Sequence, residues 1–275
     1  MTDLKTLLDS VQQIAIDAGE KIMEVYERDG SIDVQSKGDD SPLTEADTKA
    51  NALITKQLRS LTPDIPIMSE EEAITPYETR RQWQEYWLVD PLDGTKEFIN
   101  RNGEFTVNIA LIRAGQPVLG VVFAPVLQLS WLGVAGEGAW KQEGAASRQA
   151  IGVAKMGADK IRVVASRRHG GEALEEMLLR LKDLFKEVEL VNMGSSLKIC
   201  ILAEGKADLY PRLAPTSEWD TAAAQAVLAA AGGEVTRTNL EALRYNTKES
   251  VLNPFFLALG DTAYDWRNAL GELPE

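Results

Sequence analysis

Apolar residues recur at every third or fourth position over residues 4–25. This spacing predicts a long amphipathic helix that ends near Gly30. The polar stretch over residues 36–42 is typical of a loop or of the tip of a hairpin. A second helix is predicted to begin at Thr44, where Asp47 completes a capping pattern in the first turn.

Shorter apolar runs then predict strands. A strand is expected between residues 61 and 69, just before three consecutive acids that begin at Glu70. The run Tyr86–Val89 is predicted to be a buried strand that ends at Asp90. Antiparallel strands at hairpin spacing are expected over residues 106–112, 118–124 and 127–134.

Strands and helices alternate beyond residue 160. The pattern predicts strands over residues 161–165, 188–193 and 207–210, and helices over residues 172–186, 195–203 and 220–231. We therefore expect two domains, an α+β half over residues 1–145 and an α/β half over residues 146–275. The small, polar segment 142–160 is the expected boundary.

The composition narrows the functions that this fold class can serve. Its 275 residues carry a net charge of -13, from 29 basic and 42 acidic side chains. Macromolecular nucleic acid is therefore an unfavourable partner, because a nucleic-acid binder needs a basic face. The single cysteine, Cys200, lies in an apolar stretch and is predicted to be a buried thiol. No apolar run is long enough to span a bilayer and the N-terminus lacks a signal-peptide layout, so we expect a cytoplasmic location.

Residues 90–95 read Asp-Pro-Leu-Asp-Gly-Thr and hold the most informative chemistry. Two carboxylates three residues apart, in a turn after a strand, repel each other unless a cation lies between them. Mg²⁺ prefers such oxygen ligands, and a chain with one histidine favours Mg²⁺ over Zn²⁺. The alternative is an ordinary turn, because Asp-Gly and Pro are common turn residues. Asp220, at the start of a predicted helix, has a similar alternative as a capping residue.

The same residues resemble the signatures of the inositol monophosphatase superfamily. Residues 90–95 are similar to its D-P-[IL]-D-G-T motif, and Trp219-Asp220 before an alanine-rich run is similar to its W-D-x-A-A motif. Glu70 resembles its G/S-E-E element, and residues 44–47 resemble its T-x-A-D element. All four occur in the order of that superfamily and cover nearly the whole chain. The resemblance implies a layered α-β-α-β-α fold with the site between the two halves.

The resemblance also implies a role for each matching residue. Five residues are similar to metal ligands, four through carboxylates and one through its backbone carbonyl: Glu70, Asp90, Asp93, Asp220 and Leu92. Catalytic roles are implied for Asp47, Glu70 and Thr95, with Thr95 and Asp47 polarising the attacking water. The implied cofactor is Mg²⁺, two or three ions per site, with Mn²⁺ as a substitute and Li⁺ as an inhibitor.

Residues 87–98, 102–110, 194–198 and 210–212 further resemble the bacterial CysQ type of that superfamily. Such enzymes are 3′(2′),5′-bisphosphate nucleotidases, which hydrolyse 3′-phosphoadenosine 5′-phosphate to AMP and phosphate in connection with sulfate assimilation. Arg168 departs from the S-R-S-H pattern of that type. Ser195 is expected to cap its helix, with Lys198 one turn further. Substrate contacts are implied for Glu70, Leu92, Asp93, Gly94, Thr95, His169, Ser195, Lys198, Arg212 and Asp220.

Three alternatives stay open at this point. An inositol or broad sugar phosphatase would share every carboxylate. A non-catalytic nucleotide sensor would keep the fold alone, and an acidic scaffold would use these motifs as turns and caps. The expected partner is a small phosphorylated nucleotide, bound by a monomer or a homodimer. Peripheral contact with the inner membrane is a further alternative to a purely cytoplasmic location.

Overall fold

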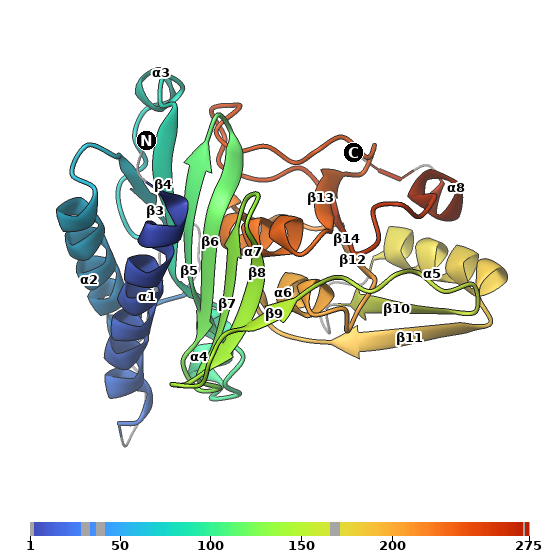
Figure 1. Ribbon diagram of the computed structural model, residues 1–275, viewed down its shortest axis with the longest axis horizontal. Coiled ribbons are helices and arrows are strands. Elements are labelled where there is room, and N and C mark those ends of the chain that lie inside the picture. The colour runs from blue at the N-terminus through green and yellow to red at the C-terminus, as the bar shows by residue number, and fades with distance from the viewer. Residues whose placement is uncertain (1–2, 29–33, 37–41, 166–170, 272, 275) are drawn as a thin grey trace.

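The computed structural model describes residues 3–28, 34–36, 42–165, 171–271 and 273–274. Helices and sheets alternate in five layers, with a seven-stranded sheet and a five-stranded sheet as the two β layers (Figure 1). The layered α-β-α-β-α fold predicted from the sequence is therefore confirmed. Within the described residues, none of the helices is both long enough and apolar enough to cross a membrane.

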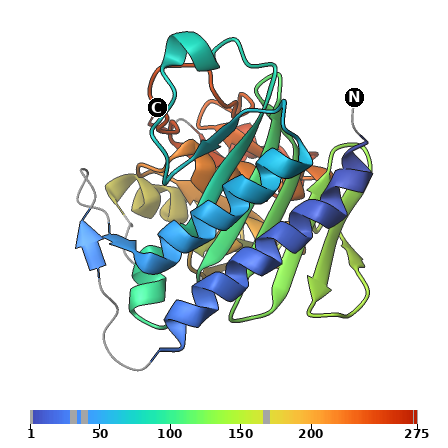
Figure 2. The same ribbon diagram turned by 90° about the vertical axis from the view of Figure 1, so that its left-hand side faces the viewer.

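The first layer consists of α1 (Leu4–Tyr26) and α2 (Glu45–Leu61), which run side by side over one face of the large sheet (Figure 2). The apolar stripe of α1 is buried against this sheet, which explains why its helical period was so clear. The helix ends at Tyr26, a few residues earlier than predicted. Between the two helices, β1 (Val34–Ser36) and β2 (Pro42–Thr44) pair as a hairpin whose tip lies outside the described residues.

The large sheet keeps the sequence order from β3 to β9. Its strands pair antiparallel except the first two, which are parallel. The strands are β3 (Ile67–Ser69), β4 (Glu85–Asp93), β5 (Thr106–Arg113), β6 (Gln116–Ala124), β7 (Leu129–Val134), β8 (Gly138–Glu143) and β9 (Gln149–Ile151). Two short helices flank β4, namely α3 (Tyr77–Arg80) and α4 (Thr95–Ile99).

Alternation along the strands of this sheet divides the core into two parts. Trp87 and Val89 of β4 point toward α1 and α2, whereas Tyr86 and Leu88 point toward the middle helices. Both faces are buried, so these strands appear in the sequence as continuous apolar runs. The next residue on the face of Tyr86 and Leu88 is Asp90, which the alternation therefore directs into the middle of the molecule.

The middle layer holds α6 (Leu197–Ala203) and α7 (Glu218–Ala230). Glycines let α7 lie directly against the sheet, since a Cβ on Gly120 would come 2.2 Å from the Ala223 carbonyl oxygen and one on Gly133 would come 2.5 Å from Val227 Cα. The many alanines of α7 have the same effect, because small side chains let the helix pack closely against the sheet. This contact fixes where the first turn of α7 lies.

The small sheet and two outer helices complete the fold. Its strand order is β11-β10-β12-β14-β13. The strands are β10 (Lys160–Ala165), β11 (Glu187–Asn192), β12 (Leu209–Arg212), β13 (Glu234–Arg237) and β14 (Phe256–Leu259). On its outer side lie α5 (Glu172–Leu184) and α8 (Trp266–Leu270) (Figure 1). The division into two domains at residue 145 stays a prediction; β9 and α7, from the second part of the chain, lie in and against the large sheet.

Candidate active site

The first part of the site is the end of β4. The strand does not end at Asp90, as the sequence predicted, but continues to Asp93. Asp90 pairs with Asn108 and Asp93 pairs with Thr106, so three steps along β4 match two along β5. In a regular strand, residues three apart point to opposite faces. The extra residue of this bulge turns Asp93 to the same face as Asp90, toward α6 and α7.

Carboxylates from three elements meet at this face. Glu70 follows β3, Asp90 lies in β4, and Asp220 lies in the first turn of α7. One oxygen atom from each lies within 4.8 Å of the others. Such a group of oxygen donors fits a hard divalent cation such as Mg²⁺. The structure thus brings three of the predicted acids together, while their role as ligands stays a proposal.

The pKa values of these acids reflect both burial and mutual repulsion. Burial, and then the charge of Glu70, raise the pKa of Asp90 well above its usual range. Burial also raises the pKa of Asp93 to about 6, although the charge of Lys198 and the Ser196 N–H oppose the change. Burial and the charge of Asp93 raise the pKa of Asp220 to about 8. Burying carboxylates close together is unfavourable, so such a group is typical of a functional site. A bound cation would favour their charged forms.

Asp47 and Thr95 form a second group beside these acids. Asp47 is buried, and its Oδ2 accepts the Thr44 N–H at 2.8 Å and the Thr44 hydroxyl at 2.6 Å. Its Oδ1 lies 3.3 Å from the Thr95 hydroxyl, which is also 3.4 Å from the Leu92 carbonyl oxygen. Asp47 is thus both the predicted capping residue and a neighbour of Thr95.

The backbone at Gly94 makes this arrangement possible. Its φ of 94° is in the left-handed region that glycine adopts most readily, and α4 begins at the next residue. The turn expected after the strand is present, and α4 follows it directly. A Cβ at Gly94 would also lie 3.2 Å from the Glu104 carbonyl oxygen and 3.3 Å from Ser195 Cβ, so the close approach of the two halves favours glycine as well.

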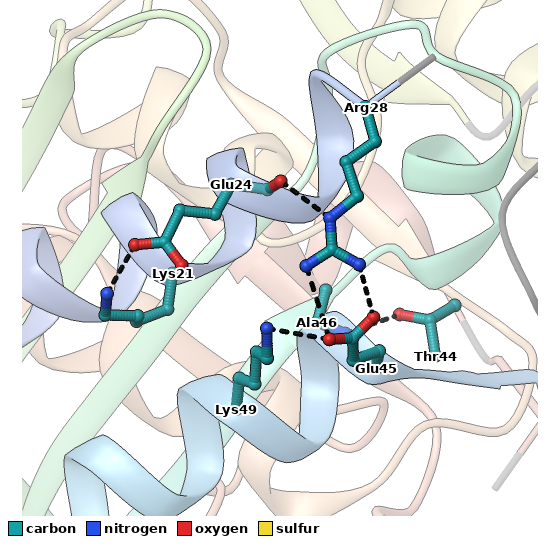
Figure 3. A network of polar contacts seen from close by, with 7 residues as sticks. All are labelled: Lys21, Glu24, Arg28, Thr44, Glu45, Ala46 and Lys49. Carbon is teal, nitrogen blue, oxygen red and sulfur yellow. Dashed lines mark hydrogen bonds and ion pairs between the residues drawn. The ribbon is translucent and has the colours of Figure 1, made fainter. Parts of the chain in front are cut away.

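Exposed ion pairs surround the start of α2, near Asp47 (Figure 3). Arg28, just after α1, contacts Glu45 with its Nη1 at 2.6 Å from Oε2. Lys49 contacts the same carboxylate at 2.7 Å. The side chains of Arg28 and Glu45 are about half exposed, at 50% and 46%, so this pair contributes little to stability. It links the end of α1 to the start of α2 without entering the site.

A cavity of about 100 Å³ opens beside Asp93 and Asp220. The small sheet and α6 supply its basic wall, with Lys198 and Arg212. Lys198 donates to the Ser195 carbonyl at 3.0 Å, and burial lowers its pKa from the ordinary value. Arg212 donates to the Pro215 carbonyl at 3.1 Å, whereas its buried Nε has no hydrogen-bond partner among the residues that the structure describes.

Ser195 lines the same cavity but differs from its prediction. Its backbone has a φ of 40°, and the N-cap position of α6 is Ser196. Ser196 has helical rather than extended backbone angles and its side chain makes no capping hydrogen bond, so the serine cap predicted for this helix is wrong. The predicted contact residue His169 and its neighbours over residues 166–170 lie outside the described residues.

Sequence reasoning missed the residues that connect the two halves. The Ser196 N–H donates to Asp93 at 2.5 Å, and the Ser196 hydroxyl donates to Asn108 Oδ1 at 2.9 Å. Thr106 Oγ1 lies 2.8 Å from the Ser196 hydroxyl. Tyr210 also lines the cavity, with its ring 5.9 Å from Lys198 Nζ. Polar residues at positions 106 and 108 interrupt an apolar strand, and that interruption was the available signal.

Comparisons with known proteins agree with this arrangement. The model of the inositol monophosphatase family matches residues 3–266. The chain is 50% identical over 250 residues to the 3′(2′),5′-bisphosphate nucleotidase CysQ of Escherichia coli strain K12, covering 91% of this chain and 98% of that protein. The protein of that name from Buchnera aphidicola is 43% identical over 92% of this chain and 94% of its own.

A solved structure shows the same fold. The crystal structure of CysQ from Bacteroides thetaiotaomicron superposes with a TM-score of 0.81 at 43% identity, covering 93% of this chain and 97% of that one. It is described as a bacterial member of the inositol monophosphatase family. Family match, sequence identity and fold therefore lead to one conclusion: this chain belongs to the inositol monophosphatase family.

Proposed function

We propose that this protein is an Mg²⁺-dependent 3′(2′),5′-bisphosphate nucleotidase that hydrolyses 3′-phosphoadenosine 5′-phosphate to AMP and phosphate. The observation that carries the proposal is the carboxylate group of Glu70, Asp90 and Asp220, with one oxygen of each within 4.8 Å of the others, directly beside a cavity with a basic wall. The name of the CysQ relatives, at up to about half identity over nearly the whole chain, supports the choice of substrate.

Glu70, Asp90, Asp93 and Asp220 would hold the metal ions, together with the backbone carbonyl of Leu92. All five are oxygen donors from three separate segments, and the raised pKa values of three of them agree with a site built for positive charge. When bound, Mg²⁺ neutralises the charge of the phosphate and lowers the pKa of a bound water. Two or three ions per site, replacement by Mn²⁺ and inhibition by Li⁺ are parts of the proposal.

Thr95 and Asp47 would orient the attacking water. The Thr95 hydroxyl donates to Asp47 Oδ1, and its oxygen can then accept a hydrogen from water. Asp47 cannot turn away, because its other oxygen is held by the Thr44 N–H and hydroxyl. The water proton would pass through Thr95 Oγ1 to Asp47 as the oxygen of the water bonds to phosphorus, while the bond from phosphorus to the 3′-oxygen breaks and that oxygen takes a proton from solvent water.

The basic wall would bind the part of the nucleotide that does not react. Lys198 and Arg212 face the same cavity as Asp93, and the unpartnered Arg212 Nε is an available donor for a phosphate oxygen. Ser195 would contact the second phosphate or the ribose, and the backbone of Gly94 and Thr95 would face the reacting phosphate. A simple sugar phosphate carries one phosphate and would leave this donor unused, which favours a bisphosphate.

A substrate profile tests the proposal. With Mg²⁺ present, phosphate release from 3′-phosphoadenosine 5′-phosphate is expected to exceed release from inositol 1-phosphate, and millimolar Li⁺ is expected to inhibit it. Faster turnover of the inositol ester would replace the proposal with an inositol phosphatase. Asp90→Asn is the matched variant, and phosphate release at the unchanged rate would exclude the metal site described above.

A further inference from the structure

A second and larger cavity, of about 600 Å³, lies beside the first turn of α7. Residues of β13 and of the segment 241–254 line it together with Glu218. It shares no lining residue with the cavity next to Asp93. Glu218 and Asp220 both belong to the first turn of α7, but residues two apart on a helix do not face the same way. Thr221 of the smaller cavity lies one helical turn from Glu218, so the two cavities are neighbours with separate linings.

Two residues that line this cavity carry a buried acceptor atom that has no hydrogen-bond partner among the described residues. These atoms are Oε2 of Glu218, which is 2% exposed, and Oδ1 of Asn253, which is 8% exposed. The rest of each side chain is in use, since Glu218 Oε1 accepts the Asn246 N–H at 2.8 Å and Asn253 Nδ2 donates to the Ser217 carbonyl at 2.7 Å. The carbonyl can only accept, so the orientation of the Asn253 amide is fixed. Buried acceptors of this kind call for N–H or O–H donors.

Cations outnumber acids on the lining of this cavity, three to two, although the whole chain carries a charge of -13. Arg244 and Lys248 are exposed, and within the part of the chain that the structure describes neither forms an ion pair with a carboxylate. Arg237, the third cation, pairs with Glu241 at 3.3 Å. The backbone at the rim of the cavity is held from below by the buried Arg80, which donates to the Lys248 carbonyl at 3.1 Å. The rim thus presents cationic side chains on an anchored segment.

We propose that this cavity is a second ligand site that binds a nucleoside monophosphate. Its volume lies within the range of small-molecule pockets, which is roughly 300–1,000 Å³. Hydroxyl or amino groups of the nucleoside would donate to Glu218 Oε2 and Asn253 Oδ1, and the phosphate would bind Arg244 and Lys248. Leu252 and Pro254 supply an apolar wall for the base. A free phosphate or a nucleoside would satisfy only part of this surface. The inference concerns binding and does not depend on the proposed nucleotidase activity.

Binding of AMP to the full-length protein in Mg²⁺, measured by calorimetry, tests this site. Lys198→Ala/Arg212→Ala serves as the background, because it weakens nucleotide binding in the proposed active site. In this background AMP is expected to bind with a stoichiometry of one. Adding Arg244→Glu/Lys248→Glu should weaken binding at least about tenfold, since charge reversal replaces attraction with repulsion. Both of these side chains are exposed, so the fold should be unaffected.

Matched controls separate this site from general electrostatics. Lys5→Glu/Lys186→Glu makes the same change in charge at exposed positions elsewhere and should leave AMP binding unchanged. Adenosine and inorganic phosphate should each bind at least about tenfold more weakly than AMP, because each meets part of the surface. The proposal is overturned if AMP does not bind in the background variant, if charge reversal at positions 244 and 248 has no effect, or if phosphate or adenosine alone binds as tightly as AMP.

Discussion

Helices α2 and α7 begin in the same way but face different surroundings. In each, the acid at the third helical position accepts the backbone N–H of the residue before the helix, at 2.8 Å from Thr44 to Asp47 and at 2.9 Å from Ser217 to Asp220. In each, the other carboxylate oxygen is left for the site. Asp47 directs it to the Thr95 hydroxyl, whereas Asp220 lies among other acids.

The difference teaches how one local motif serves two chemical purposes. A capping interaction holds a carboxylate in a fixed direction, and the neighbours then decide what it does. Beside a hydroxyl, as at Asp47, it accepts a hydrogen bond. Beside Glu70 and Asp90, as at Asp220, it adds negative charge that a cation must offset. Asn retains the capping acceptor without the charge, so Asp→Asn at either position tests the chemistry while keeping the cap.

The largest effect is expected for Asp220→Asn. Loss of one carboxylate from the group that would hold metal should lower the rate of phosphate release on the order of 10³-fold or more. Mg²⁺ affinity, measured by calorimetry, should fall in parallel, while the melting temperature changes little. Loss of activity together with unfolding would mean that Asp220 acts through its cap alone.

A smaller effect is expected for Asp47→Asn, about 10²-fold on the rate, because it removes the acceptor for the proton of the water. Thr95→Val should lower the rate by a similar factor. The double variant should be hardly slower than either single one, because both changes interrupt the same contact. If the two losses of rate multiplied in the double variant, the two residues would act separately. Mg²⁺ affinity should be unchanged in both single variants, in contrast to Asp220→Asn.

Gly120→Ala tests whether the position of α7 matters as much as its acid. An added Cβ would meet the Ala223 carbonyl at 2.2 Å, so the helix must shift and the free energy of unfolding should fall by about 1–3 kcal/mol. The rate should fall as well, since Asp220 moves with α7. Gly157→Ala is the control, because nothing lies within 4 Å of its added Cβ. Equal stability of both variants would contradict the close packing.

Metal-free protein should lose stability as pH rises from about 4 to about 8. Asp93 and Asp220 have raised pKa values, about 6 and about 8, against an ordinary 3.8, so the folded state binds protons that the unfolded chain has released. The melting temperature in EDTA should therefore be higher at pH 5 than at pH 8. Mg²⁺ should reduce this difference. If the melting temperatures at pH 5 and pH 8 differed equally with and without Mg²⁺, then Asp93 and Asp220 would not bind the metal.

The smallest effect is expected for the exposed contacts at the start of α2. Arg28→Ala should leave the melting temperature nearly unchanged, because the Arg28–Glu45 pair is about half exposed and screened by water (Figure 3). The rate of phosphate release should also stay the same. A large loss of activity would show that this surface network, and not the cap alone, positions Asp47.

Much of this arrangement could be predicted from the sequence. Helical spacing predicted α1, the Thr44–Asp47 pattern predicted the start of α2, and the motifs identified the acids that meet in space. Short elements without a clear period, such as β13, β14 and α8, were not predicted, because long-range pairing and packing define them. The extension of β4 to Asp93 and the contacts of Ser196 with Asp93 and Asn108 also depend on residues far apart in the sequence, which no local pattern contains.

The bulge at the end of β4 has a consequence for how the chain can change. Asp90 and Asp93 face the same side although they are three residues apart, because β4 has two residues between them where β5 has one between their partners. Straightening β4 at the same chain length would turn one carboxylate toward α1 and α2. The bulge is therefore as much a part of the site as the acids themselves. A change that keeps both acids but removes the bulge should cost the site one of them.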